Sequence, residues 1–216
     1  MAERLTLYTN PMSRGRIARW MLEEVACDYE TVLLEYGTTM KAADFLAINP
    51  MGKVPTIRHG DTVVTEAAAI CAYLADAFPD AGLAPPPGNP RRGPYYRWLF
   101  FAAGPLEAAV TAKALGILAP PDKAAMAGYG TYEATLGALE TAVGSGPYIC
   151  GDQFTAADVY VGAQIGWGLM FGTIERRPVF ESYFARLAER PAARRAKDLD
   201  DALAEQVRSG PQPGAG

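Results

Sequence analysis

A segment dense in proline and glycine, residues 79–90 (PDAGLAPPPGNP), divides the chain into two parts with different hydrophobic patterns. Such residues end helices and strands, so the segment is typical of a linker. Before it, short β-type runs alternate with runs of helical period, and after it every periodic run is helical. The sequence therefore predicts an α/β domain over residues 1–79, a linker over 80–90, an all-α domain over 91–208 and a disordered tail over 209–216.

The first part has the element order βαβ-α-ββα. Short β-type runs predict strands at residues 5–8, 29–34, 54–58 and 62–65, with a hairpin turn at His59 and Gly60. Helical spacing predicts helices at residues 14–26, 41–48 and 66–78. A parallel pair joined by a helix, followed by an antiparallel hairpin and a closing helix, is the thioredoxin-like arrangement of a four-stranded mixed sheet.

The second part is expected to be all-helical. Predicted helices cover residues 92–118 with a kink at Gly104 and Pro105, 122–143, 156–171, 179–189 and 192–207. Thr155 and Asp158 have the spacing of a capping box, with Asp in place of the usual Glu. A carboxylate three residues after an N-cap threonine is usually structural, so we expect Asp158 to cap a helix rather than to bind a metal or act in catalysis.

Charge and hydropathy exclude several functional classes. The net charge of −4 and the pI near 5.1 give no basic footprint for nucleic acid. No apolar run approaches the length of a membrane span, and charges within the first residues, MAERLTLYT, argue against a signal peptide. Half of the residues are hydrophobic, which is enough to bury a core. We expect a cytoplasmic protein that acts on small molecules and contacts neither nucleic acid nor membrane.

Cysteine and histidine usage limits the chemistry further. The three cysteines, Cys27, Cys71 and Cys150, form no CxxC pair and no metal spacing, and an odd count argues against a disulfide framework. We therefore expect free thiols. His59 is the single histidine, so a His-based triad or a His metal cluster is nearly excluded, and no bound metal is expected.

The most informative local pattern joins Val54-Pro55 to Glu66. A proline between β-branched residues belongs at the first residue of a strand or in a turn. If its peptide bond is cis, the chain turns sharply, and the N–H and C=O of Val54 point outward toward a ligand's backbone. Glu66 begins an apolar helix, whose N-terminal N–H groups favour a bound carboxylate. Together these features predict a site for a peptide-like anion.

The chain resembles the cytosolic glutathione transferases over nearly its whole length. NPMGKVP at residues 49–55 is similar to that family's loop before a cis-proline, and EAAAI at residues 66–70 is similar to its E-S-x-A-I motif. The proline-rich linker and GDQFTAAD at residues 151–158 complete the likeness. The resemblance implies an enzyme of detoxification with glutathione as co-substrate. It would add glutathione to a hydrophobic electrophile or use it to reduce an organic peroxide.

That chemistry needs a donor aimed at the glutathione sulfur, because a free thiol has a pKa of about 8.5. A hydroxyl at the N-terminus of the first helix can serve, aided by the helix dipole. Ser13 is the first candidate as catalytic residue and Asn10 the second; Tyr8 and Thr9 are weaker ones. The chain has NPMS at residues 10–13 where a glutaredoxin-like protein has CPxC, so thiol–disulfide exchange by a protein cysteine is not expected.

The remaining glutathione contacts are implied by the resemblance. The backbone of Val54, beside Pro55, would pair with the cysteinyl part, as in the addition of a strand to a sheet edge. Lys53 would reach the glycyl carboxylate, although a solvated surface lysine is the alternative. Glu66 would hold the γ-glutamyl ammonium and the N–H of Ala67 its carboxylate. Ala67 stands where the family usually has serine, which implies weaker binding of glutathione.

A hydrophobic co-substrate pocket is expected between the loop at residues 8–13 and the first long helix after the linker. Tyr8, Met12, Phe101 and Gly104 are its predicted residues. Large residues near the end of the capped helix form a weaker second set: Trp167, Met170 and Phe171.

Two alternative functions stay open. A glutathione-dependent isomerase of the maleylacetoacetate isomerase type would need basic groups such as Arg14 or Arg16 for an acidic substrate. A non-catalytic interaction module is favoured by Ala67. In either case we expect a homodimer that pairs each thioredoxin-like domain with the partner's helical domain. Its interface elements would be the helix at residues 66–78 and the helix that begins near residue 92.

Overall fold

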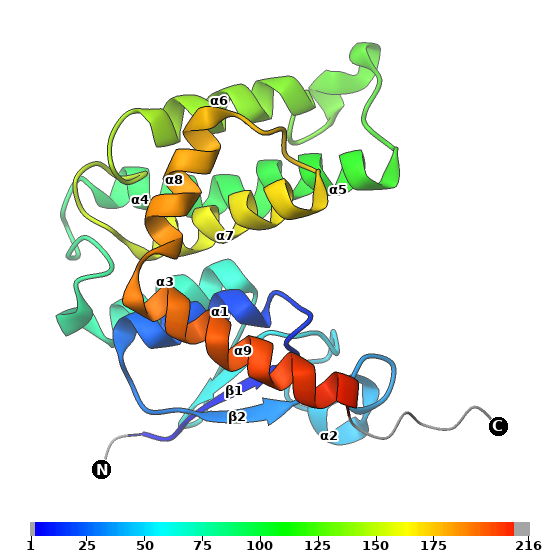
Figure 1. The fold of residues 1–216 in the computed structure, drawn as a ribbon, viewed down its shortest axis with the longest axis vertical. Helices are drawn as coiled ribbons and strands as arrows, with labels where there is room; N and C mark the ends of the chain where they lie inside the picture. The colour runs from blue at the N-terminus through cyan, green and yellow to red at the C-terminus, as the bar shows by residue number, and fades with distance from the viewer. Residues whose placement is uncertain (1–2, 210–216) are drawn as a thin grey trace. The chain divides into compact units, whose positions relative to one another are not determined.

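The computed structural model describes residues 3–209 (Figure 1). The chain forms two compact units: Met1–Ile70 with Arg190–Gly216, and Cys71–Glu189. The predicted tail at 209–216 lies outside the described residues except for Ser209, which ends the last helix. Within residues 3–209, none of the helices combines the length and the apolarity needed to cross a membrane.

The first unit is built on a four-stranded mixed sheet of order β2-β1-β3-β4. β2 (Glu30–Leu33) runs parallel to β1 (Leu5–Thr9), while β3 (Thr56–His59) is antiparallel to β1 and β4 (Thr62–Thr65) is antiparallel to β3. The turn between β3 and β4 contains Gly60 with a positive φ. The predicted thioredoxin-like sheet and its hairpin are therefore confirmed.

The two faces of β1 carry different contacts, because successive strand residues point to opposite sides. Leu7 is fully buried, and α1 (Gly15–Val25) packs against β1. Tyr8 belongs to a core cluster with Leu34, Met40 and Phe45. Met40 lies in η1 (Thr39–Lys41) and Phe45 in α2 (Ala43–Leu46), so the helix predicted at residues 41–48 is two short turns. α3 (Ala67–Ala77) follows β4, and the division between the units falls within it, after Ile70.

The last helix, α9 (Pro191–Ser209), belongs to the first unit and packs along α1 (Figure 1). The Arg19–Asp200 ion pair, which is almost fully buried, joins the two helices, and Arg190, just before α9, pairs with Glu24 of α1. The all-α domain predicted over residues 91–208 includes this helix. Its contacts with α1 group it instead with the thioredoxin-like sheet.

The second unit is helical, as predicted. Its elements are η2 (Pro79–Ala81), α4 (Arg92–Phe101), η3 (Ala102–Leu106), α5 (Glu107–Leu115), η4 (Pro121–Met126), α6 (Tyr132–Gly144), α7 (Ala156–Phe171) and α8 (Pro178–Ala188). α7 packs against α4 and α8, and α6 packs against α5 and α8. The predicted capping box is confirmed, since the Thr155 side chain accepts from the backbone at Asp158 while the Asp158 carboxylate accepts from the Thr155 N–H.

Two predicted helices of this unit differ from the structure. The helix expected at residues 92–118 contains a π-helical turn, η3, where Gly104 and Pro105 interrupt the regular hydrogen bonding, and it ends at Gly116 in the left-handed conformation. The helix expected at residues 122–143 is wrong in its first half. The regular helix starts only at Tyr132, because Gly130 has a positive φ just before it.

Candidate functional site

The turn between β1 and α1 carries the predicted catalytic side chains. β1 ends at Thr9 and α1 begins at Gly15, one residue later than the sequence indicated. A Cβ at Gly15 would lie 1.8 Å from the Thr9 hydroxyl oxygen, so only glycine lets the helix start so close to the strand end. The N-terminus of α1, with its unpaired N–H groups and positive dipole end, is thereby held at the end of β1.

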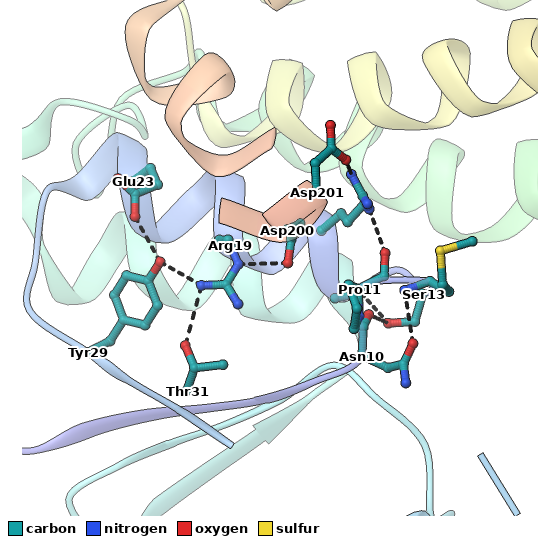
Figure 2. Close-up of polar contacts among 12 residues, drawn as sticks. Asn10, Pro11, Ser13, Arg19, Glu23, Tyr29, Thr31, Asp200 and Asp201 are labelled. Atoms are coloured by element: carbon teal, nitrogen blue, oxygen red, sulfur yellow. Dashed lines mark hydrogen bonds and ion pairs between the residues drawn. The ribbon is translucent and has the colours of Figure 1, made fainter. Parts of the chain in front are cut away.

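Ser13 and Asn10 are hydrogen-bonded within this turn (Figure 2). The Ser13 hydroxyl donates to the carbonyl oxygen of Asn10 at 2.6 Å and accepts the N–H of Gly15 at 2.9 Å. The Asn10 amide nitrogen donates to the carbonyl of Leu34 at 2.8 Å, while its Oδ1 accepts the N–H of Met12 at 2.9 Å. Both side chains therefore shape the turn, and both are buried.

This arrangement defines what each group must do to reach a sulfur. The Ser13 hydroxyl has a single proton, which now goes to Asn10, so donation to a thiolate requires a change of acceptor. Asn10 has a second amide hydrogen beyond the one given to Leu34. Thr9 is fully buried, and its hydroxyl oxygen has no hydrogen-bond partner within residues 3–209. The choice between Ser13 and Asn10 stays a prediction.

The Val54–Pro55 peptide bond is cis, as the resemblance implied. Two side chains with no predicted role hold the loop before it. Asn49 donates to the Lys53 carbonyl at 2.8 Å and to the Thr56 hydroxyl at 3.1 Å. Lys41 donates to the carbonyls of Met51 and Gly52 at 3.0 and 2.9 Å. The Asn49-Pro50 pair is a turn signal that could have identified Asn49, whereas Lys41 reaches the loop from another element and has no local signal.

This loop presents a backbone edge. The N–H and C=O of Val54 make no hydrogen bond within the part of the chain that the structure describes. The Val54 side chain packs against the cluster around Phe45, and the side chain of Lys53 is exposed. Unpaired backbone groups beside the end of a sheet are what an extended peptide needs in order to add to it.

Glu66 adopts a conformation that is rare for its residue type. Its φ is +66°, in the left-handed region that favours glycine, although its carbonyl still accepts the N–H of Ile70 at 2.9 Å. The Glu66 side chain is exposed, and α3 begins at Ala67, which is buried. Non-glycine residues in this region cluster at ligand-binding sites, so the backbone adds a signal that the sequence did not contain.

A polar network around Arg19 of α1 lies to one side of the turn (Figure 2). Arg19 donates to Asp200 at 2.8 Å and to the Tyr29 hydroxyl at 3.1 Å, and that hydroxyl donates to Glu23 at 2.8 Å. Burial, reinforced by the hydrogen bond to Glu23, raises the pKa of Tyr29 to about 12. Tyr29 therefore stays neutral at physiological pH, so this network is structural rather than acid–base in character.

The predicted co-substrate residues are divided between the two units. In the first, Tyr8 packs 5.7 Å from Phe45 in the core, which favours a structural role for its ring, while Met12 is exposed. In the second, Phe101 is half-buried against Trp98, and Gly104 lies exposed in the π-helical turn. In the weaker second set, Trp167 is half-buried, whereas Met170 and Phe171 are exposed. Their grouping into one pocket stays a prediction.

The cysteines are free thiols, as predicted. Burial raises the pKa of Cys27 and of Cys150 to about 11 and raises that of Cys71 as well. A thiol with so high a pKa is a poor nucleophile at neutral pH. Among residues 3–209, no group of three or more His, Cys, Asp or Glu side chains is placed to hold a metal ion.

Comparison with known protein families and sequences gives consistent matches. The model of the glutathione S-transferase N-terminal domain matches residues 3–76, and that of the glutathione S-transferase C-terminal domain matches residues 107–167. Glutathione S-transferase GstA of Escherichia coli O157:H7 is 31% identical over 167 residues, which cover 76% of this chain and 78% of that protein.

Solved structures give the same result. A glutathione transferase from Methylococcus capsulatus str. bath has a TM-score of 0.77 and 29% identity, covering 92% of this chain and 99% of its own. A sphingomonad glutathione S-transferase, solved in complex with glutathione, has a TM-score of 0.73 and 27% identity, covering 91% and 98%. With both halves matched and relatives aligned over most of its length, this chain belongs to the glutathione S-transferase family.

Proposed function

We propose that this glutathione transferase binds glutathione across the cis-proline loop and the start of α3, with the sulfur directed at the turn of residues 10–13. The backbone of Val54 pairs with the cysteinyl part, Lys53 reaches the glycyl carboxylate, and Glu66 holds the γ-glutamyl ammonium. The N–H of Ala67 binds the γ-glutamyl carboxylate at the N-terminus of α3. The unpaired Val54 backbone beside Pro55 is the observation that carries this proposal.

The chemical step is stabilisation of the glutathione thiolate. Ser13 releases the Asn10 carbonyl and donates a hydrogen bond from its hydroxyl to the thiolate sulfur, and the N-terminus of α1 adds its positive dipole end. Asn10 is the second candidate donor, through its remaining amide hydrogen. The thiolate then attacks a hydrophobic electrophile or reduces an organic peroxide, next to the pocket predicted from Tyr8, Met12, Phe101 and Gly104.

The two alternatives have less support. Arg16 is engaged by a carbonyl and a carboxylate of its own unit, which counts against its use for an acidic isomerase substrate. Ala67 removes one hydroxyl from the γ-glutamyl site but leaves the N–H groups of the α3 N-terminus in place. A reduced affinity for glutathione is therefore a better interpretation than a purely non-catalytic module.

The test is calorimetric binding of S-methylglutathione, which has the same backbone but no ionisable thiol. Glu66→Gln removes the charge that faces the ammonium with little change of shape, so the affinity should fall roughly tenfold. Asp61→Asn is the matched control, since Asp61 is an exposed acid in the neighbouring hairpin turn and should bind like wild type. Equal affinity of Glu66→Gln and wild type would contradict the proposed orientation, and absence of binding by wild type would contradict the function.

A further inference from the structure

Arg16 connects the turn of residues 10–13 to the last helix of the chain. Its Nε donates to the carbonyl oxygen of Pro11 at 2.6 Å, and its Nη1 contacts the carboxylate of Asp201 in α9 at 2.7 Å. Both partners, Pro11 and Asp201, are labelled in Figure 2. One planar group thus joins the turn to α9, although Arg16 and Asp201 lie 185 residues apart in the sequence.

The carbonyl that Arg16 holds adjoins the carbonyl that Ser13 uses. Asn10 accepts the Ser13 hydroxyl, and the next carbonyl along the chain, that of Pro11, accepts Arg16. Proline has a fixed φ, so fixing the Pro11 carbonyl also limits the orientation of the neighbouring peptide planes. We propose that Arg16, held in place by Asp201, is a positioning residue that sets the direction of the donor at residues 10–13 toward the glutathione sulfur. This inference rests on the proposed function.

The carboxylate of Asp201 is well suited to this task. Fixing an arginine side chain costs rotamer entropy. A carboxylate bound to one edge of the planar guanidinium holds its other edge toward the acceptor. Lys197 also contacts Asp201, at 2.7 Å, and these two cationic partners hold the pKa of Asp201 below its ordinary value. Asp201 therefore stays charged throughout the neutral range in which the thiolate is needed.

The same helix pair contains a matched control. Arg195 of α9 contacts the Glu23 carboxylate of α1 at 3.1 Å, and its side chain is more exposed than that of Arg16. Neither Arg195 nor Glu23 contacts residues 10–13 in the described part of the chain. Loss of this pair removes an ion pair between α1 and α9 without disturbing the Pro11 carbonyl.

The experiment measures the pKa of the bound glutathione thiol from the ultraviolet absorbance of the thiolate. It compares wild type, Asp201→Asn and Arg195→Gln, with the affinity for S-methylglutathione as a second readout. Asp201→Asn should raise the thiol pKa by about half a unit, which corresponds to roughly threefold less thiolate in the neutral range. The affinity for S-methylglutathione should stay unchanged, because that ligand has no thiol to orient. Arg195→Gln should match wild type in both measurements.

Arg16→Lys is the second variant. Lysine keeps the positive charge but lacks the planar guanidinium that contacts both Pro11 and Asp201. This variant should therefore raise the pKa of the bound thiol, as Asp201→Asn should. In the absence of glutathione, amide hydrogen exchange at residues 12–15 should be faster in Asp201→Asn and Arg16→Lys than in Arg195→Gln.

The outcomes separate this inference from the proposed function. A wild-type protein that binds no S-methylglutathione overturns both. A wild-type protein that binds and ionises glutathione, with Asp201→Asn and Arg16→Lys indistinguishable from Arg195→Gln, overturns the positioning role alone. A raised thiol pKa accompanied by an equal loss of S-methylglutathione affinity also overturns it, because that result indicates general damage to the site.

Discussion

Ser13 illustrates how one hydroxyl can have both a structural and a chemical use. It bridges the Asn10 carbonyl and the Gly15 N–H in the present structure, which is a capping-type arrangement one residue ahead of the helix N-cap. Its bond to a neutral carbonyl is worth about 1 kcal/mol, whereas a bond to an anion is worth about 1.5–3 kcal/mol. A thiolate that arrives next to Ser13 is therefore the stronger acceptor, and the hydroxyl should redirect its hydrogen bond from the Asn10 carbonyl to the sulfur.

Ala67 leads to a prediction at the γ-glutamyl end of the site. Ala67→Ser adds a hydroxyl where the resemblance implies one, at a helix N-terminus that already favours a carboxylate, so glutathione should bind about threefold to tenfold more tightly. Calorimetry with Ala69→Ser, an exposed position on the same helix, supplies the control. An unchanged or weaker affinity in Ala67→Ser would place the γ-glutamyl group elsewhere.

The cysteines lead to a second prediction. Because burial raises the pKa of Cys27 and Cys150 to about 11, their thiolate fraction at pH 7 is on the order of one part in ten thousand. Cys27→Ser and Cys150→Ser should retain wild-type transferase activity, and iodoacetamide should modify the native protein slowly. Rapid alkylation at neutral pH, or a large loss of activity in either variant, would contradict this expectation.

At the scale of elements, the structure follows the sequence where a local signal is strong. α7 has the predicted bounds, because Thr155 and Asp158 specify its start and Gly172 its end. The strand pattern around Val54-Pro55 and the hairpin at Gly60 are equally local. By contrast, the π-helical turn at Gly104 and Pro105 and the late start of α6 depend on how neighbouring turns pack, which periodicity does not report.

The buried capping carboxylate leads to a stability prediction. Asp158 accepts hydrogen bonds from the N–H groups of Ile149 and Thr155 at 2.8 Å and from the Tyr183 hydroxyl at 2.7 Å. Asp158→Ala leaves several buried donors unpaired, so the free energy of unfolding should fall by about 3 kcal/mol or more. Urea denaturation measures this, with the exposed Asp152→Ala as control. A loss below about 1 kcal/mol would show that the capping box contributes little to stability.

The candidate site was predictable in part, for reasons visible in particular residues. Val54, Pro55 and Glu66 lie in continuous motifs, so their pattern predicts a site for a peptide-like anion, and the resemblance implies their contacts with glutathione. Lys41 contacts the cis-proline loop and Asp201 contacts Arg16 from other elements, and nothing in their neighbourhood of the sequence identifies these partners. The left-handed backbone of Glu66 was equally hidden, since glutamate rarely adopts it.

At the scale of the whole molecule, the grouping of α9 with the thioredoxin-like unit is the main departure from the sequence interpretation. Asp200 of α9 pairs with Arg19 of α1, and Arg190, just before α9, pairs with Glu24 of α1; these partners lie far apart in the sequence. α9 contacts α1, and Asp201 of α9 contacts Arg16, which in turn donates to the Pro11 carbonyl in the turn at residues 10–13.

Homodimer formation is a prediction at this scale. α3 is rich in small and apolar residues, and α4 carries the exposed side chains Tyr96 and Phe100. Burial of these surfaces by a second copy should give twice the chain mass of 23.1 kDa in sedimentation equilibrium at micromolar concentration. Ala69→Arg, on the exposed side of α3, should shift the mass toward one chain, whereas Ala108→Arg on α5 should not. A wild-type mass of one chain with full glutathione binding would contradict the dimer.

The pKa of the glutathione thiol in the bound state tests the catalytic role of the turn at residues 10–13 most directly. Titration of the thiolate absorbance in wild type should give a value clearly below the value of about 8.5 for a free thiol. Ser13→Ala should raise it by about one unit and slow conjugation at least tenfold, with unchanged affinity for S-methylglutathione. If the lowered thiol pKa is lost in Asn10→Ala but kept in Ser13→Ala, the role belongs to Asn10. A bound thiol in wild type that titrates like free glutathione would contradict thiolate stabilisation at this turn.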